Sequence, residues 1–184
     1  MRPNYALILL IFVFACHALA GVFTPQDVLN TKKATEVALS PNGDFIAYTV
    51  YSTRSADDKA GSGYRELYVV STSSGEIRPF LTGKVSVSSV AWQPDGEMIS
   101  FKMKRGDNKF TQVWGLPLNG GEARQLTKAK SSVLLYRWSK DGSMLGFVAQ
   151  TPKSKREKAL SDKGYGFTFF EENLKDRNLY LQNM

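Results

Sequence analysis

The chain has 184 residues, of which 42% are hydrophobic, and 24 Lys plus Arg against 17 Asp plus Glu give a net charge of +7. This composition excludes a disordered or collagen-like chain and is typical of a folded globular protein. Cys16 is the only cysteine and His17 the only histidine. At about 100–200 residues per domain, the length allows one domain or a part of a larger one.

The N-terminal segment, residues 1–20, has the three parts of a secretory signal peptide. Arg2 supplies a basic start, an apolar run extends over residues 5–15, and the small residues Ala18 and Ala20 fit the cleavage rule. We therefore expect export to a periplasmic or extracellular compartment, with no membrane attachment after cleavage. Two alternatives stay open. The segment could act as a membrane anchor, although its apolar run is shorter than the ~20 residues that span a bilayer, or the chain could be lipidated at its cysteine.

Cleavage after Ala20 would leave a mature chain, residues 21–184, without Cys16 and His17. Such a chain can form no disulfide and no zinc site built from cysteine or histidine. It also lacks the imidazole that a Ser–His–Asp or Cys–His catalytic group requires. We therefore expect no catalytic residue, no metal site and no cofactor in it, and its substrate-binding residues are unknown from the sequence.

One sequence unit occurs three times, at residues 37–48, 90–101 and 136–147. Each copy contains two apolar strands joined by a turn, and the turn glycines Gly43 and Gly96 are 53 residues apart, while Gly142 follows 46 residues later. Proline, asparagine, aspartate and glycine at these turns favour tight hairpins. A repeat of this length is typical of a four-stranded propeller blade.

Further strands are expected after each hairpin, so the fold class is all-β. The sequence predicts a β-propeller fragment of four-stranded antiparallel blades at about residues 34–83, 84–130 and 131–184, the last incomplete, after a signal peptide helix. The second strands are apolar on successive residues, which suits sheets covered on both faces. A generic antiparallel sandwich is the alternative, but it has no need to repeat one turn in register.

The repeat resembles the TolB-type propeller repeat, in which a Ser-Pro-Asp-Gly turn precedes an Ile-Ala-Phe strand, a Leu-Tyr-Val strand and a Gly-Gly-Glu turn. The segment from Phe23 to Leu29, followed by residues 34–48, is similar to the N-terminus of secreted peptidases of the prolyl oligopeptidase family, near the acylaminoacyl-peptidase and dipeptidyl-peptidase branches. The resemblance covers about residues 23–184. It implies a propeller that restricts and orients peptide substrates over a C-terminal α/β-hydrolase domain of the same polypeptide.

That catalytic domain is absent from the 184 residues, which contain no G-x-S-x-G nucleophile elbow. We therefore expect an N-terminal fragment or truncated product that is inactive by itself, with the hydrolase domain and its peptide substrates as partners. The alternative is a free-standing TolB-like propeller that acts through protein–protein contacts. The excess positive charge is scattered outside residues 151–177, so we expect no nucleic acid as a partner.

An enlarged loop at about residues 151–177 separates the second and third strands of the last copy. It begins with basic residues and continues with aromatic residues and the pair Glu171 and Glu172. Three interpretations are open: a solvated surface excursion with its aromatics against the blades, a gate or docking element facing the catalytic domain, or a site where both glutamates bind a substrate ammonium. The last interpretation is implied only by the resemblance to dipeptidyl peptidases.

Overall fold

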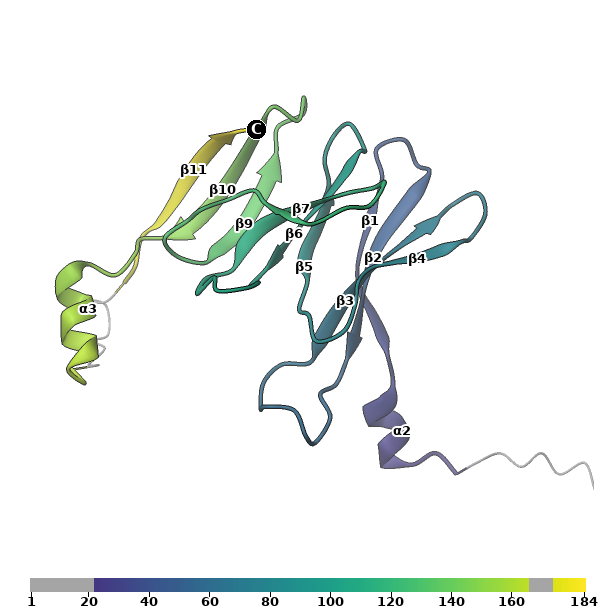
Figure 1. Cartoon of the computed structure of the whole chain (residues 1–184), viewed down its shortest axis with the longest axis horizontal. Helices are drawn as coiled ribbons and strands as arrows, with labels where there is room; N and C mark the ends of the chain where they lie inside the picture. The colour runs from purple at the N-terminus through teal and green to yellow at the C-terminus, as the bar shows by residue number, and fades with distance from the viewer. Residues whose placement is uncertain (1–21, 166–173) are drawn as a thin grey trace, which may run out of the picture. The chain divides into compact units, whose positions relative to one another are not determined.

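The computed structural model describes residues 22–165 and 174–184 (Figure 1). The chain divides into two units, Met1–Thr31 and Lys32–Met184. The expected signal segment lies outside the described residues. Within the described part of the chain, no helix is both long and apolar enough to cross a membrane.

The first unit contains the short helix α2 (Pro25–Asn30), which begins in the segment that resembles secreted peptidases. Thr24 caps this helix: its hydroxyl accepts a hydrogen bond from the backbone N–H of Asp27, and the Asp27 carboxylate accepts one from the backbone N–H of Thr24. Pro25 occupies the first helical position, where no intrahelical N–H is needed. The Thr-Pro-Gln-Asp sequence therefore specifies a helix start.

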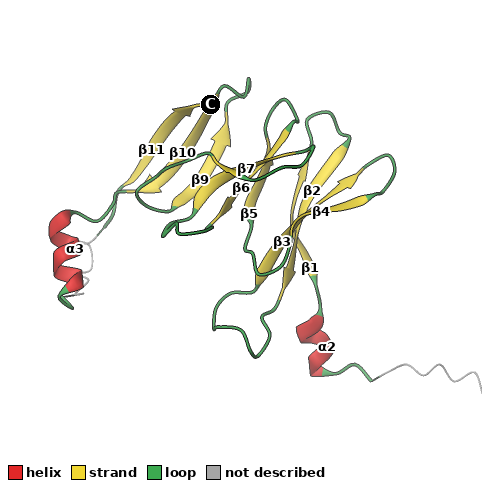
Figure 2. Ribbon diagram, in the orientation of Figure 1, coloured by secondary structure: helices red, strands yellow, loops and turns green. Residues whose placement is uncertain are grey.

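The second unit consists of three antiparallel sheets, each formed by consecutive strands (Figures 1 and 2). Sheet 1 contains β1 (Lys33–Leu39), β2 (Phe45–Ser52), β3 (Tyr64–Ser71) and β4 (Ile77–Leu81). Sheet 2 contains β5 (Ser88–Trp92), β6 (Met98–Met103), β7 (Gln112–Pro117) and β8 (Arg124–Gln125). Sheet 3 contains β9 (Val133–Trp138), β10 (Met144–Gln150) and β11 (Arg177–Asn183). The predicted all-β fold of antiparallel blades is confirmed, with four, four and three strands in the described residues.

The repeated turns have one backbone structure in all three sheets. In the turn of sheet 2, Gly96 donates to the carbonyl of Gln93, Gln93 donates to the carbonyl of Met98, and the Asp95 carboxylate accepts from the N–H of Glu97. Equivalent hydrogen bonds occur in the other two turns, with the Asn42 amide oxygen as the side-chain acceptor in sheet 1 and the Asp141 carboxylate in sheet 3. The turn glycines Gly43, Gly96 and Gly142 have φ values of 80°, 78° and 72°, a region that side chains disfavour. The similarity of the three sequences thus reflects one hairpin geometry.

Replacing Gly96 by alanine should lower the free energy of unfolding by about 1 kcal/mol. The added Cβ would meet only the Cδ of Pro41, at 3.7 Å, so the cost comes from the positive φ and not from a clash. Urea denaturation measures the change, with Glu97→Ala as the control because it keeps the backbone N–H of the same turn. Equal stability of the two variants would contradict the turn assignment.

The three sheets pack face to face in chain order. Phe45 and Ala47 of β2 face sheet 2, and Ile99 and Phe101 of β6 face back toward sheet 1, in one buried cluster. Met98 of β6 faces the opposite way and joins a second cluster with Val133, Leu145 and Phe147 of sheet 3. Because successive residues of a strand point to opposite faces, sheet 2 is covered on both sides.

Continuous burial is found only in the second strand of sheet 2. In β6, all residues except Lys102 are buried, whereas β2 and β10 bury alternate residues. Within the described sheets, β6 is therefore covered on both faces, whereas β2 and β10 are each covered on one. The outward faces of sheets 1 and 3 leave Val37, Leu39, Leu179 and Leu181 exposed.

Candidate functional site

The first strands of sheets 2 and 3, β5 and β9, which we call the inner strands, meet at a junction organised around Ser100 of β6. The Ser100 hydroxyl accepts a hydrogen bond from the Trp138 Nε1 (2.8 Å) and donates one to the carbonyl of Ala91 (3.0 Å). The Tyr136 hydroxyl donates its single proton to the carbonyl oxygen of Ser89 at 2.7 Å and lies 3.0 Å from the Ser100 oxygen. Each polar group of this buried network is thus satisfied, which stabilises the contact between sheets 2 and 3.

A corresponding junction joins β1 of sheet 1 to β5 of sheet 2. The Trp92 Nε1 donates to the carbonyl of Ala38 at 2.8 Å, and the Glu36 carboxylate accepts from the N–H of Val90 at 3.1 Å. Trp92 and Trp138, at the ends of β5 and β9, therefore anchor sheets 2 and 3 to the preceding sheet. The tryptophans were part of the sequence repeat, but their partners lie 38 to 54 residues away.

A cavity of about 300 Å³ lies between β5 and β9. Its described lining residues are Ser89, Val90, Ala91, Leu135, Tyr136 and Arg137. Ser89 has a φ of 53°, and the register of β5 with β6 is irregular between Ser88 and Ala91. A non-glycine residue in this conformation is uncommon and stores strain, which clusters at functional sites. This cavity is the candidate site at the inner strands.

The chemistry available at this cavity is that of binding. Arg137 is exposed at its edge and can present a guanidinium to a carboxylate. The Ser100 hydroxyl is already engaged by three protein groups, so it is not poised as a nucleophile. The described residues include neither histidine nor cysteine, and none of them form a cluster of three or more possible metal ligands.

The Tyr136 phenol should make stability fall at high pH. Burial raises the pKa of Tyr136 well above its usual value near 10. The unfolded chain loses this proton as the pH rises past about 10 while the folded chain keeps it, so the free energy of unfolding decreases there. Tyr136→Phe should reduce the decrease between about pH 8 and about pH 11. Urea denaturation across this range is the measurement, and Tyr165→Phe, which removes a hydroxyl from an exposed tyrosine, is the control.

The enlarged loop of the third repeat contains a helix that was not predicted from the sequence. Helix α3 (Lys155–Asp162) begins after Ser154, whose hydroxyl accepts from the N–H of Glu157, while the Glu157 carboxylate accepts from the N–H of Ser154. The Ser-Lys-Arg-Glu sequence is a capping box and could have revealed the helix. α3 buries no residue and lies clear of the three sheets (Figure 2).

The aromatic and acidic part of this loop is only partly described. Tyr165 is exposed, so this aromatic is not tucked against the blades. Glu171 and Glu172, the two residues considered for binding an ammonium group, lie outside the described residues.

No protein-family model matches the chain, and no curated protein matches its sequence. Solved structures do match its fold. A protein assigned as TolB from Agrobacterium tumefaciens is 18% identical, with a TM-score of 0.55 over 84% of this chain and 47% of that one. An acylaminoacyl peptidase from Pyrococcus horikoshii is 15% identical, with a TM-score of 0.56 over 70% of this chain and 19% of that one.

A third match is the β-propeller domain of the trilobed protease from Pyrococcus furiosus, described as having an open velcro topology. It is 16% identical, with a TM-score of 0.51 over 64% of this chain and 34% of that one. The chain spans less than half the length of each of these proteins. Its three sheets therefore have the β-propeller fold that occurs in TolB and in the propeller domains of peptidases of this kind.

Proposed function

We propose that the chain is the N-terminal propeller portion of an exported serine peptidase. In this role the blades restrict and orient peptide substrates, and an α/β-hydrolase domain of the same polypeptide carries out the chemistry. The observation that carries the proposal is the combination of the repeated blade with the Phe23–Leu29 segment, which is similar to the N-terminus of mature secreted peptidases. The fold shared with peptidase propellers supports the same role.

The chemistry of the described residues agrees with a role in binding. The cavity between β5 and β9 offers the guanidinium of Arg137, but its described lining contains no base paired with a serine. A propeller is a rigid scaffold on which such surface groups can select ligands. Export rests on the signal-like segment, residues 1–20, whose small residue Ala20 fits the cleavage rule.

The coding sequence downstream of Met184 tests the proposal. We expect several hundred further codons that specify a G-x-S-x-G motif between a strand and a helix. Further blade repeats without such a motif would contradict the peptidase assignment. They would favour the second candidate, a TolB-like binding module. The structural similarity to TolB over 84% of the chain supports this candidate.

The purified 184-residue chain should hydrolyse no peptide or aminoacyl ester. It should also remain unlabelled by a fluorophosphonate probe, which reacts with activated serines, because no serine is paired with an imidazole in residues 21–184. Mass spectrometry after incubation with the probe is the measurement. Stoichiometric labelling together with turnover in homogeneous protein would place catalysis within this chain and overturn the proposal.

A further inference from the structure

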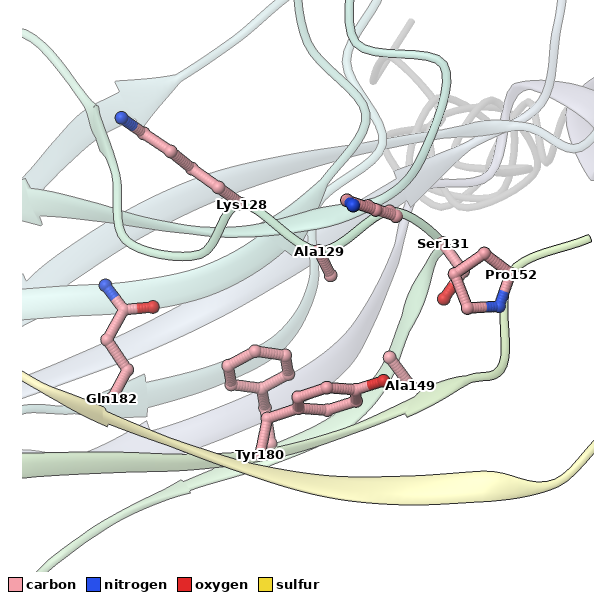
Figure 3. Close-up of a pocket in the computed structure, with 9 residues that line it drawn as sticks. Lys128, Ala129, Ser131, Ala149, Pro152, Tyr180 and Gln182 are labelled. Carbon is pink, nitrogen blue, oxygen red and sulfur yellow. The ribbon is translucent and has the colours of Figure 1, made fainter. Parts of the chain in front are cut away.

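A second cavity, of about 400 Å³, lies between sheet 3 and the segment that connects β8 to β9. Phe147, Ala149 and Tyr180 form its floor on β10 and β11, and residues 128–131 of the connecting segment form its roof. Figure 3 shows Tyr180 on β11 below the segment that carries Ala129. Its volume falls within the range of small-molecule sites, and it shares no described lining residue with the cavity between β5 and β9.

The floor of this cavity is an aromatic surface. The rings of Phe147 and Tyr180 are stacked, with centroids 5.2 Å apart and an interplanar angle of 15°. Phe147 is buried, whereas Tyr180 is 37% exposed. Part of the Tyr180 ring is therefore available to a bound group, and such surfaces favour a planar ring in offset stacking.

The roof is held in place by the buried amide of Gln112. Its Nε2 donates to the carbonyls of Ala129 (3.0 Å) and Ser131 (3.4 Å). Its Oε1 accepts from the N–H of Ala129 and from the hydroxyl of Thr127, both at 2.9 Å. The Ser131 hydroxyl in turn donates to the carbonyl of Gln150 at 2.6 Å. These bonds fix the roof before any ligand arrives, which lowers the entropic cost of binding.

The side chains of the roof are small or charged. Leu126 and Val133, on either side of the roof in the chain, are buried in the cluster between sheets 2 and 3. Of the four roof residues, Lys128-Ala129-Lys130-Ser131, only Ala129 packs against this cluster. The roof therefore places no large apolar side chain over the rings.

The charge of the lining is positive. Lys128 and Lys130 are exposed, and the described lining contains no acidic residue. Within the described residues neither lysine is paired with a carboxylate, whereas Lys84 bonds to Asp58 at 2.6 Å in another part of the chain. Figure 3 shows the Lys128 side chain extending away from Tyr180, so its ammonium group must turn toward the rings to bind a ligand anion, and it can do so without breaking an ion pair with an acidic side chain.

We propose that this cavity binds a carboxylate that carries an aromatic ring, with the ring on Phe147 and Tyr180 and the carboxylate at Lys128 and Lys130. Under the proposed function, the natural carrier is a peptide that ends in an aromatic residue. The choice of a peptide rests on that function, whereas the preference for an aromatic carboxylate rests on the cavity alone.

A titration of the full chain with four probes tests this preference. NMR chemical-shift changes of the protein report the binding of each probe. The probes are N-acetyl-phenylalanine, its neutral amide, N-acetyl-alanine, and the peptide acetyl-Ala-Ala-Phe with a free carboxylate. We expect the first and last to bind about tenfold more tightly than the other two, the difference that about 1.4 kcal/mol produces. Equal binding of the amide or of N-acetyl-alanine would overturn the proposal.

Paired substitutions locate the site. Lys128→Gln with Lys130→Gln should weaken binding of N-acetyl-phenylalanine about tenfold, which corresponds to about 1.4 kcal/mol. The control is Lys155→Gln with Lys158→Gln in α3, which removes the same charge from another exposed segment and should leave the affinity unchanged. Tyr180→Leu should weaken binding as well, with circular dichroism to check folding.

The outcomes separate this inference from the proposed function. Unchanged affinity in the variant of Lys128 and Lys130 would place the binding elsewhere and overturn the site. Binding of N-acetyl-phenylalanine without binding of acetyl-Ala-Ala-Phe would overturn the peptide as carrier while supporting the aromatic carboxylate. Neither result depends on the coding sequence downstream of Met184, which tests the peptidase assignment independently.

Discussion

Replacing Phe101 by alanine should lower the free energy of unfolding by about 3–5 kcal/mol, the usual cost of truncating a buried aromatic residue. Phe101 is completely buried in the cluster between sheets 1 and 2, together with Leu67, Val69 and Ile99. Removal of its ring would leave a cavity at the contact that joins the two sheets. Since small domains are stable by only about 5–15 kcal/mol, this change should affect a large share of the total.

Urea denaturation followed by tryptophan fluorescence measures this loss, because Trp92 is buried in the same cluster. Leu179→Ala is the control, since Leu179 is 69% exposed and its truncation should change stability by no more than about 0.5 kcal/mol. If the alanine variant does not fold, Phe101→Leu should still show a loss of about 1–2 kcal/mol. Equal effects at the buried and exposed positions would contradict the packing of sheet 1 on sheet 2.

Replacing Gln112 by leucine should cost about 2–4 kcal/mol, although the two side chains are similar in size. The substitution leaves the N–H of Ala129, its carbonyl and the Thr127 hydroxyl without the amide that they bond. Each buried polar group left unsatisfied costs about 1–3 kcal/mol. The roof of the cavity above Tyr180 should loosen at the same time.

Two measurements check the effect of Gln112→Leu. Urea denaturation should show the loss of stability, and hydrogen exchange should become faster at the N–H of Ala129, which bonds to the Gln112 Oε1 at 2.9 Å. Gln182→Leu makes the same chemical change at a half-buried position of the cavity and should leave this exchange rate unchanged. Unaltered exchange in the Gln112 variant would show that the roof does not depend on the amide.

The repeat made the blades predictable from sequence. Turns with Gly43, Gly96 or Gly142 between apolar strands indicate hairpins, because their residue types match a positive φ and a bonded side chain at fixed places. Repetition in one register then separates a propeller from a sandwich. The inward and outward faces of each sheet could not be assigned in advance, because alternation fixes two faces but not which of them another sheet covers.

The helices and the cavities were harder to predict, for different reasons. α2 and α3 begin with capping boxes at Thr24 and Ser154 that are readable in the sequence, but both helices are short and bury no residue, so no apolar periodicity marks them. The role of Gln112 depends on partners 15 to 19 residues away, and a glutamine at the start of a strand has no distinctive pattern. The positive φ of Ser89 likewise follows from tertiary packing.

The stacking of the three repeats as successive blades is tested most directly by NMR of the tryptophan indole groups. We expect slowly exchanging Nε1–H protons for Trp92 and Trp138, with nuclear Overhauser contacts from Trp92 to Ala38 and from Trp138 to Ser100, because each indole bonds to the preceding sheet at 2.8 Å. Rapid exchange of both protons, or contacts confined to the repeat that contains each tryptophan, would contradict the propeller arrangement.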